Sequence, residues 1–322
     1  MSFFNFFRKD PRVGIYYRNH NSILNDVIPN FRLVSPEKSK AFVLWADSQG
    51  PSREIAEYAK KLGKPLIVVQ HGKHSVREYV PPVNFELLAD KICVWGSSDY
   101  DMLVNNGIDK SRVILTGSPI FNNVDRTREK TDGRNVVYAP LHWDCEIEEN
   151  HQIYDELMKI KDIKMTVKLL KKRHDPKRYG KNVIITTQRE PNLLQLIFDL
   201  LKKTDIVVSN TTGTFELIAM YFNIPVIYVD NFKARPFLDL SAEIIAEQKQ
   251  KEPPPKGVDY TKNINELSDL IRLNIANPDR LKLEREKELN NCAAVGTLKK
   301  PAQNIVNVIL GAINNDKNVV IE

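Results

Sequence analysis

The chain has 322 residues, of which 42% are hydrophobic and 27% are charged. This composition is typical of a folded globular protein and excludes disordered and fibrous classes. The length predicts two domains, each large enough to bury a core without disulfides. The 47 Lys and Arg residues against 41 Asp and Glu residues give a net charge of +6, which indicates anionic ligands rather than bulk nucleic acid.

The cysteines and the N-terminus bear on the compartment. Cys93, Cys145 and Cys292 form no CxxC pair, which favours a reducing compartment and no structural metal. No window approaches the roughly 20 apolar residues of a membrane span, and the N-terminus lacks a secretory signal pattern, so we expect a cytoplasmic protein. The stretch 2–9, rich in Phe and ending in two cations, fits either peripheral contact with a membrane surface or burial against the first domain.

Short apolar runs alternate with amphipathic stretches of helical length along most of the chain. This alternation predicts an α/β fold with parallel sheets. In the first half, strands are predicted at 13–17, 41–46, 66–70, 92–95 and 113–115, and helices at 52–62 and 98–106. In the second half, strands are predicted at 136–139, 165–169, 183–187, 206–209 and 226–229, helices at 152–161, 193–202 and 214–222, and only helical segments beyond.

A polar stretch at 125–134 has almost no apolar residue to pack and is predicted to be an interdomain linker. The predicted domains are therefore residues 1–132 and 133–322.

Polar or glycine-containing turns follow several strands of the first domain. Since the carboxyl ends of parallel strands meet at one edge of a sheet, these turns are expected to share a ligand-binding edge. His71 is a candidate general base because its pKa near neutrality suits proton transfer, and Gly72 would leave space for substrate. Asp47 is the rival base, and a structural role for His71 is the alternative interpretation.

The hydroxyl-rich turn from Ser209 to Glu216 follows a buried strand and opens a helix. Unpaired backbone N–H groups and hydroxyls at such a helix start can hold a phosphate. Gly213 would let the backbone approach a ligand, and Glu216 could accept hydrogen bonds from sugar hydroxyls. An ordinary helix start, with Glu216 and a Thr in a capping box, is the alternative that local pattern alone favours.

A basic run at 159–181 carries ten Lys or Arg against two Asp. Most such runs are solvated surfaces, but Arg173 and His174 follow a predicted strand and could bind a phosphate there. No aromatic platform is interleaved with the cations, so nucleic acid is not expected. The motifs GxGxxG and GxxxxGK[ST] do not occur, which argues against a dinucleotide dehydrogenase and a P-loop NTPase. The zinc-binding motif HExxH does not occur either, so nothing in the sequence requires a metal.

The order of these motifs resembles that of CDP-glycerol glycerophosphotransferases of the teichoic acid polymerase type and of capsule polysaccharide glycosyltransferases. The matching motifs run through His71-Gly72, 94–96, 113–119, 137–140, 173–176 and 209–216. The resemblance implies a GT-B architecture of two Rossmann-like domains, with an acceptor domain first, a nucleotide-donor domain second, and the segment 301–322 packing back on the first domain.

The resemblance also implies roles for individual residues and substrates. His71 would be the base, and the donor phosphates would be held by His174, Ser209, Thr211 and Thr212. The residue patterns described above add Arg173, Gly213 and Glu216 to this donor site. Substrate loops would include Gly72, Ser118 and His142. The donor would be a nucleotide sugar or a CDP-polyol, with no cofactor, and the acceptor a glycan or a lipid-linked molecule in cell-envelope polymer synthesis.

The chain departs from the family pattern in two places. Asp175 separates the His and Pro that are usually adjacent, and Ser-Asn-Thr-Thr replaces the usual Asp-Tyr-Ser-Ser at 209–212. The Thr-x-Gly-x-x-Glu arrangement is similar to sugar-nucleotide transferases and to non-hydrolysing UDP-N-acetylglucosamine 2-epimerases. Transfer of a sugar or polyol phosphate in the cleft between the domains is the first hypothesis.

Two alternatives stay open. The first is an epimerase, which would need several carboxylates around the sugar. The turns of the first domain supply chiefly Asp47 and Asp99, and this scarcity counts against an epimerase. A non-catalytic protein could bind an anionic polymer through the run at 159–181.

Overall fold

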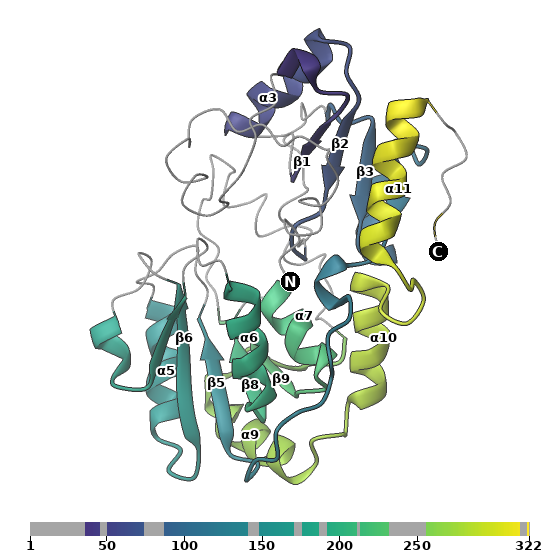
Figure 1. Ribbon diagram of the computed structural model, residues 1–322. Coiled ribbons are helices and arrows are strands. Elements are labelled where there is room, and N and C mark those ends of the chain that lie inside the picture. Colours follow the sequence, from purple (N-terminus) through teal and green to yellow (C-terminus); the bar gives the residue numbers. More distant parts are fainter. Residues whose placement is uncertain are drawn as a thin grey trace. The chain divides into compact units, whose positions relative to one another are not determined.

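The computed structural model describes residues 36–45, 50–73, 87–140, 148–170, 176–186, 192–210, 213–231, 256–315 and 321. They form two compact units, each with its own parallel β-sheet (Figure 1). Unit 1 contains the described residues up to Lys73, those from Leu87 to Val124, and those from Asn290 onward; unit 2 contains Asp125–Leu289. The predicted α/β class with parallel sheets is therefore confirmed.

The sheet of unit 1 has four parallel strands in the order β1-β2-β3-β4. Its strands are β1 (Phe42–Leu44), β2 (Leu66–Val69), β3 (Lys91–Val94) and β4 (Val113–Leu115). Its helices are α3 (Gly50–Lys61), α4 (Ser97–Asn105) and α11 (Pro301–Asn314), with short 3₁₀ turns at Pro36–Lys38 and Pro119–Phe121.

Helices cover both faces of this sheet, and the side chains of each strand point alternately to one face and to the other. Leu66 and Val68 of β2 pack with α3 and α4, whereas Ile67 and Val69 pack with α11. Strands buried on both faces read as continuous apolar runs, which is why β2 was recognisable in the sequence.

The sheet of unit 2 has six parallel strands in the order β10-β9-β8-β5-β6-β7. The strands are β5 (Asn135–Ala139), β6 (Lys164–Leu170), β7 (Val183–Thr186), β8 (Ile206–Ser209), β9 (Val226–Val229) and β10 (Asp259–Thr261). The helices are α5 (Glu148–Met158), α6 (Leu193–Lys202), α7 (Thr214–Tyr221), α9 (Leu267–Ala276) and α10 (Lys282–Ala293), with 3₁₀ turns at Pro176–Tyr179 and Ile264–Glu266. The last residues of α10, from Asn290 on, belong to unit 1.

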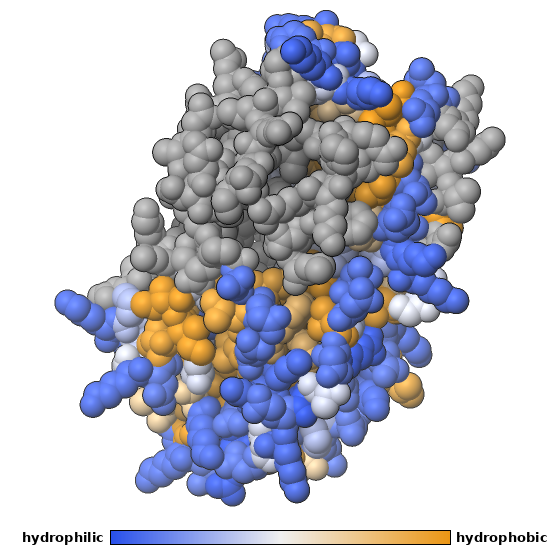
Figure 2. All heavy atoms as spheres, in the orientation of Figure 1, coloured by the Kyte–Doolittle hydropathy of each residue, from blue (hydrophilic) through white to orange (hydrophobic). Residues whose placement is uncertain are grey.

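Helices α5 and α9 pack on one face of this sheet, around a core that contains Tyr138, Val167 and Val208. Helices α6 and α7 lie on the other face (Figure 1). Figure 2 shows hydrophobic side chains on the surface over β6 and α6, and Leu196 of α6 and Ile184 of β7 are among the exposed large hydrophobic residues. Among the strands that the structure describes, β7 lies at the edge of the sheet.

Strand β10 corrects a prediction, because the region after 229 was expected to be helical only. Residues Asp259–Thr261 pair in parallel with Ile227–Val229. A polar triplet has no apolar run that would indicate a strand, so its conformation depends on the adjacent edge of β9. The predicted strand at 13–17 lies outside the described residues.

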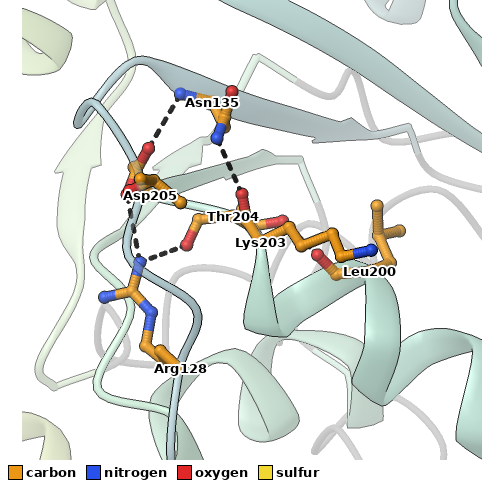
Figure 3. Close-up of polar contacts among 7 residues, drawn as sticks. Arg128, Asn135, Leu200, Lys203, Thr204 and Asp205 are labelled. Atoms are coloured by element: carbon orange, nitrogen blue, oxygen red, sulfur yellow. Dashed lines mark hydrogen bonds and ion pairs between the residues drawn. The ribbon is translucent and has the colours of Figure 1, made fainter.

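The polar stretch at 125–134 is held on unit 2 (Figure 3). Arg128 donates to the carbonyl oxygen of Thr204 and forms an ion pair of 3.2 Å with Asp205. The other carboxylate oxygen of Asp205 accepts the backbone N–H of Asn135 at 2.9 Å. The division between the two compact units falls between Val124 and Asp125, and the predicted domain boundary near 132 stays a prediction.

Candidate functional site

The strand order of unit 2 reverses between β5 and β8. From β5 the chain continues to β6 and β7 on one side, and from β8 to β9 and β10 on the other. The connection after β5 leads to α5 and the one after β8 to α7, on opposite faces of the sheet. Open parallel sheets bind ligands at the carboxyl ends of the strands at such a switch point. The predicted turn after Ser209 therefore lies where this fold places a ligand.

Glu216 holds this turn in shape. One of its carboxylate oxygens accepts the hydroxyl of Ser209 at 2.7 Å, and the other accepts the backbone N–H of Gly213 at 2.7 Å. Glu216 is only 4% exposed. Only the Glu216 half of the expected capping box is present. The N-cap is Gly213, which has no side chain to complete the box as a Thr would, so Glu216 alone fixes the N-cap at the start of α7.

Gly213 leaves space beside the start of α7. Its backbone is extended, with φ −145°. Among the described residues, a Cβ added there would meet only the Glu216 carboxylate, at the ordinary contact distance of 3.4 Å. Neither backbone conformation nor packing within the described part of the chain requires glycine at this position.

Two buried asparagines join the sides of the switch point. The side-chain amide of Asn210, after β8, donates to the side-chain oxygen of Asn150, in the first turn of α5, at 2.8 Å. Both residues are at most 3% exposed, and the Tyr138 hydroxyl donates to the backbone carbonyl of Asn150 at 3.0 Å. Sequence reasoning missed this pair, because only the strand order brings the two residues together.

Asn231, which follows β9, contributes a further amide to the same edge. Its side-chain N–H donates to the backbone carbonyl of Glu149 at 3.0 Å. Its side-chain oxygen is buried and accepts no hydrogen bond from any residue that the structure describes. A ligand donor or a water would satisfy this oxygen. The one sequence signal for Asn231 was its place two residues after the apolar strand β9.

In unit 1, Gln70 organises the turn that contains His71. The Gln70 side chain accepts the backbone N–H of Trp95 at 2.6 Å and donates to Asp99 and to the Gly72 carbonyl, each at 2.8 Å. The carboxylate of Asp99 is thereby buried at the start of α4.

The His71 side chain is exposed at the carboxyl end of β2. Its ring centroid lies 6.3 Å from that of Trp45, which follows β1. A strand-end position and an exposed imidazole are compatible with the predicted role as a base.

Ser118 is buried against the C-terminal residues of unit 1, from Ala293 on. It is 1% exposed, and its backbone N–H donates to the carbonyl of Ala293 at 3.0 Å. The preceding Gly117 has φ +81° and packs against Pro301, which begins α11. These contacts give the turn after β4 a packing role, and a substrate role for Ser118 stays a prediction.

Six predicted site residues lie outside the described residues: Asp47, His142, Arg173, His174, Thr211 and Thr212. Their roles stay predictions.

No protein-family model matches the chain, and no curated protein matches its sequence. Similarity to solved structures is clear. A structure of Staphylococcus aureus MnaA with UDP has a TM-score of 0.61 at 12% identity and covers 99% of this chain and 94% of that one. A putative UDP-N-acetylglucosamine 2-epimerase from Listeria monocytogenes has a TM-score of 0.55 at 13% identity, over 94% of this chain and 81% of that one.

A third structure is the UDP-GlcNAc 2-epimerase from Neisseria meningitidis bound to UDP-GlcNAc. Its TM-score is 0.50 at 14% identity, over 89% of this chain and 78% of that one. At such identities the likeness establishes the fold. The chain has the GT-B architecture of two Rossmann-like domains, as predicted.

None of the helices that the structure describes has both the length and the apolar character that a membrane crossing needs.

Proposed function

We propose that the chain is an enzyme that acts on a nucleotide-activated sugar and holds the nucleotide diphosphate at the switch point of unit 2. The observation that carries this proposal is the position of the turn from Ser209 to Glu216 between β5 and β8. The open side of Gly213 suits a phosphate group, and the buried side-chain oxygen of Asn231 suits a hydroxyl donor of the ligand. UDP is the first nucleotide to test, because two of the similar structures contain UDP or UDP-GlcNAc.

The favoured reaction is transfer of the sugar, or of a polyol phosphate from a CDP-polyol, to an acceptor hydroxyl. In sugar transfer the bond between the sugar carbon and the diphosphate breaks, and the negative charge that develops on the leaving group is stabilised by N–H groups and cations at the site. His71 would take the acceptor proton. The acceptor, a glycan or lipid-linked molecule of a capsule or teichoic acid pathway, is inferred from the motif resemblance.

An epimerase related to the non-hydrolysing UDP-N-acetylglucosamine 2-epimerases is the second candidate, and the names of two similar structures favour it. The carboxylates weigh against it. Asp99 is 3% exposed and accepts a hydrogen bond from Gln70, so it is not open to a sugar. Asp47 lies outside the described residues.

A non-catalytic polymer-binding function gains little support from the basic run at 159–181. Lys159, Lys164 and Arg178 each form an ion pair with a carboxylate of unit 2. Paired cations offer less charge to a polyanion.

The test has two steps. The first measures melting temperature and binding heat with UDP, CDP, CMP and GDP. A ligand at 100 times its Kd should stabilise the folded chain by about 2.7 kcal/mol. Binding of none of these nucleotides would refute the proposal.

The second step incubates the chain with the sugar conjugate of the nucleotide that binds, with and without candidate acceptors. Nucleotide release that depends on an acceptor identifies a transferase. A change of the sugar's configuration without any acceptor identifies an epimerase.

A further inference from the structure

Lys168 lies near the carboxyl end of β6, on the face of the unit 2 sheet that α7 covers. In the pairing register, Tyr138 lies beside Val167 and Ala139 lies beside Ser209. Lys168 is therefore in the same row as Ser209. Residues in one row of a parallel sheet point to the same face, and the Ser209 hydroxyl on that face meets Glu216.

The ammonium group of Lys168 lies over the start of α7. Its nitrogen is 5.1 Å from the ring centroid of Phe215. Among the described residues, no acceptor forms a hydrogen bond or an ion pair with it. Glu216 acts on it at longer range, and both Glu216 oxygens are already engaged by Ser209 and Gly213.

This arrangement differs from that of Lys164 on the same strand, whose exposed ammonium pairs with Asp132 at 2.6 Å. Lys168 is partly buried, and this burial lowers its pKa, while Glu216 opposes the shift. A cation that is partly removed from water without a hydrogen-bond acceptor is costly to the fold. Such a cation is suited to an anionic ligand that supplies the acceptor.

We propose that Lys168 binds the diphosphate of the nucleotide held at the switch point, donating hydrogen bonds to phosphate oxygens beside the first turn of α7. This inference rests on the proposed function and adds a binding residue to its site. The rival explanation is that Lys168 only balances the charge of buried Glu216.

The test replaces Lys168 in the full chain with Met, which has a similar length and no charge. The affinities for uridine, UMP and UDP are then measured by calorimetry in low salt. We expect the Lys168→Met variant to lose affinity in proportion to phosphate content, with UDP weakened at least tenfold, UMP weakened less and uridine unchanged. Lys168→Arg keeps the charge and should retain most of the UDP affinity.

Melting temperature provides the second readout. Because the pKa of Lys168 is lowered on folding, the unfolded chain binds its proton more tightly, and the charged side chain opposes folding at neutral pH. The Lys168→Met variant should therefore melt at the wild-type temperature or higher. Lys164→Met is the matched control on the same strand and should bind all three ligands as the wild type does.

Four outcomes would overturn the inference. If Lys168→Met binds UDP as tightly as the wild type while the wild type binds UDP, the inference is wrong and the proposed function stands. If the variant melts lower and loses affinity for uridine, UMP and UDP alike, Lys168 is the structural partner of Glu216. If the wild type binds none of the three and none of CDP, CMP and GDP, the proposed function fails together with the inference. If it binds one of those nucleotides instead, the same comparison is made with that nucleotide and its nucleoside, and an unchanged affinity in Lys168→Met refutes the inference.

Discussion

Replacing Gly213 with Ala asks whether a ligand approaches the backbone at the start of α7. Alanine adopts the observed φ of −145° without strain, and within the described part of the chain the new methyl group would meet only the Glu216 carboxylate, at 3.4 Å. Alanine is less favourable than glycine at a helix N-cap, by about 0.5–1 kcal/mol. Alanine also lowers the conformational entropy of the unfolded chain, which raises the free energy of unfolding by about 0.4–1 kcal/mol. The free energy of unfolding should therefore change by less than about 1 kcal/mol.

Nucleotide binding should respond much more strongly. A methyl group forced into a filled space costs about 1–3 kcal/mol, which corresponds to roughly 5- to 150-fold weaker binding of UDP. Urea denaturation measures the first quantity and calorimetry the second. Wild-type UDP affinity in the Gly213→Ala variant would refute the idea that a phosphate closely approaches this backbone.

Gly96 provides the matched contrast, because it is also the N-cap of a helix and its φ is −141°. A Cβ at Gly96 would lie 2.0 Å from the backbone carbonyl oxygen of Asn291 in the last turn of α10. The Gly96→Ala variant should lose stability near the top of the range of about 1–3 kcal/mol, with the UDP affinity of the folded protein unchanged. Equal destabilisation by the two substitutions would show that Gly213 is also required by packing.

Three further substitutions test the supporting structure and the base. Asp205→Asn weakens the contact with Arg128 and should lower the free energy of unfolding in urea by about 1–3 kcal/mol; an unchanged value would mean that this contact does not hold the 125–134 stretch. Gln70→Leu removes the hydrogen bond that Gln70 donates to the buried Asp99 carboxylate and should lower the melting temperature, and a wild-type melting curve would contradict this. His71→Ala should slow a demonstrated transfer reaction by roughly 10²- to 10⁴-fold with donor affinity and melting temperature unchanged, whereas a lower melting temperature at the wild-type rate would identify a structural histidine.

Much of the fold was predictable because local pattern and tertiary structure agree. The bounds of β4, β8 and β9 match the prediction, since each is an apolar run that ends at polar or glycine-rich residues. Strand β10 was not predictable, because three polar residues become a strand only beside the edge of β9. The contact that ties the 125–134 stretch to unit 2 was not predictable either, because the sequence does not reveal that Arg128 and Asp205 meet.

The candidate site was predictable in part for the same reason. The turn after Ser209 carries its own local signal, a buried strand followed by hydroxyls, a glycine and a helix. Asn150 and Asn231 carry no comparable signal, and they join the site only through the order of the strands. Lys168 belongs to the basic run at 159–181. That it lies beside the candidate site, whereas Lys164 does not, follows only from the register between β6 and its neighbours.

Hydrogen exchange of the full chain, followed by mass spectrometry with and without saturating UDP, tests most directly whether the nucleotide binds at the switch point of unit 2. Ligand contacts slow the exchange of amides that they cover or order. Binding at this site should protect peptides that contain the end of β8, the turn at Gly213 and the first turn of α7, together with the first turn of α5. Protection confined to unit 1, or binding of UDP with unchanged exchange around Gly213, would contradict it.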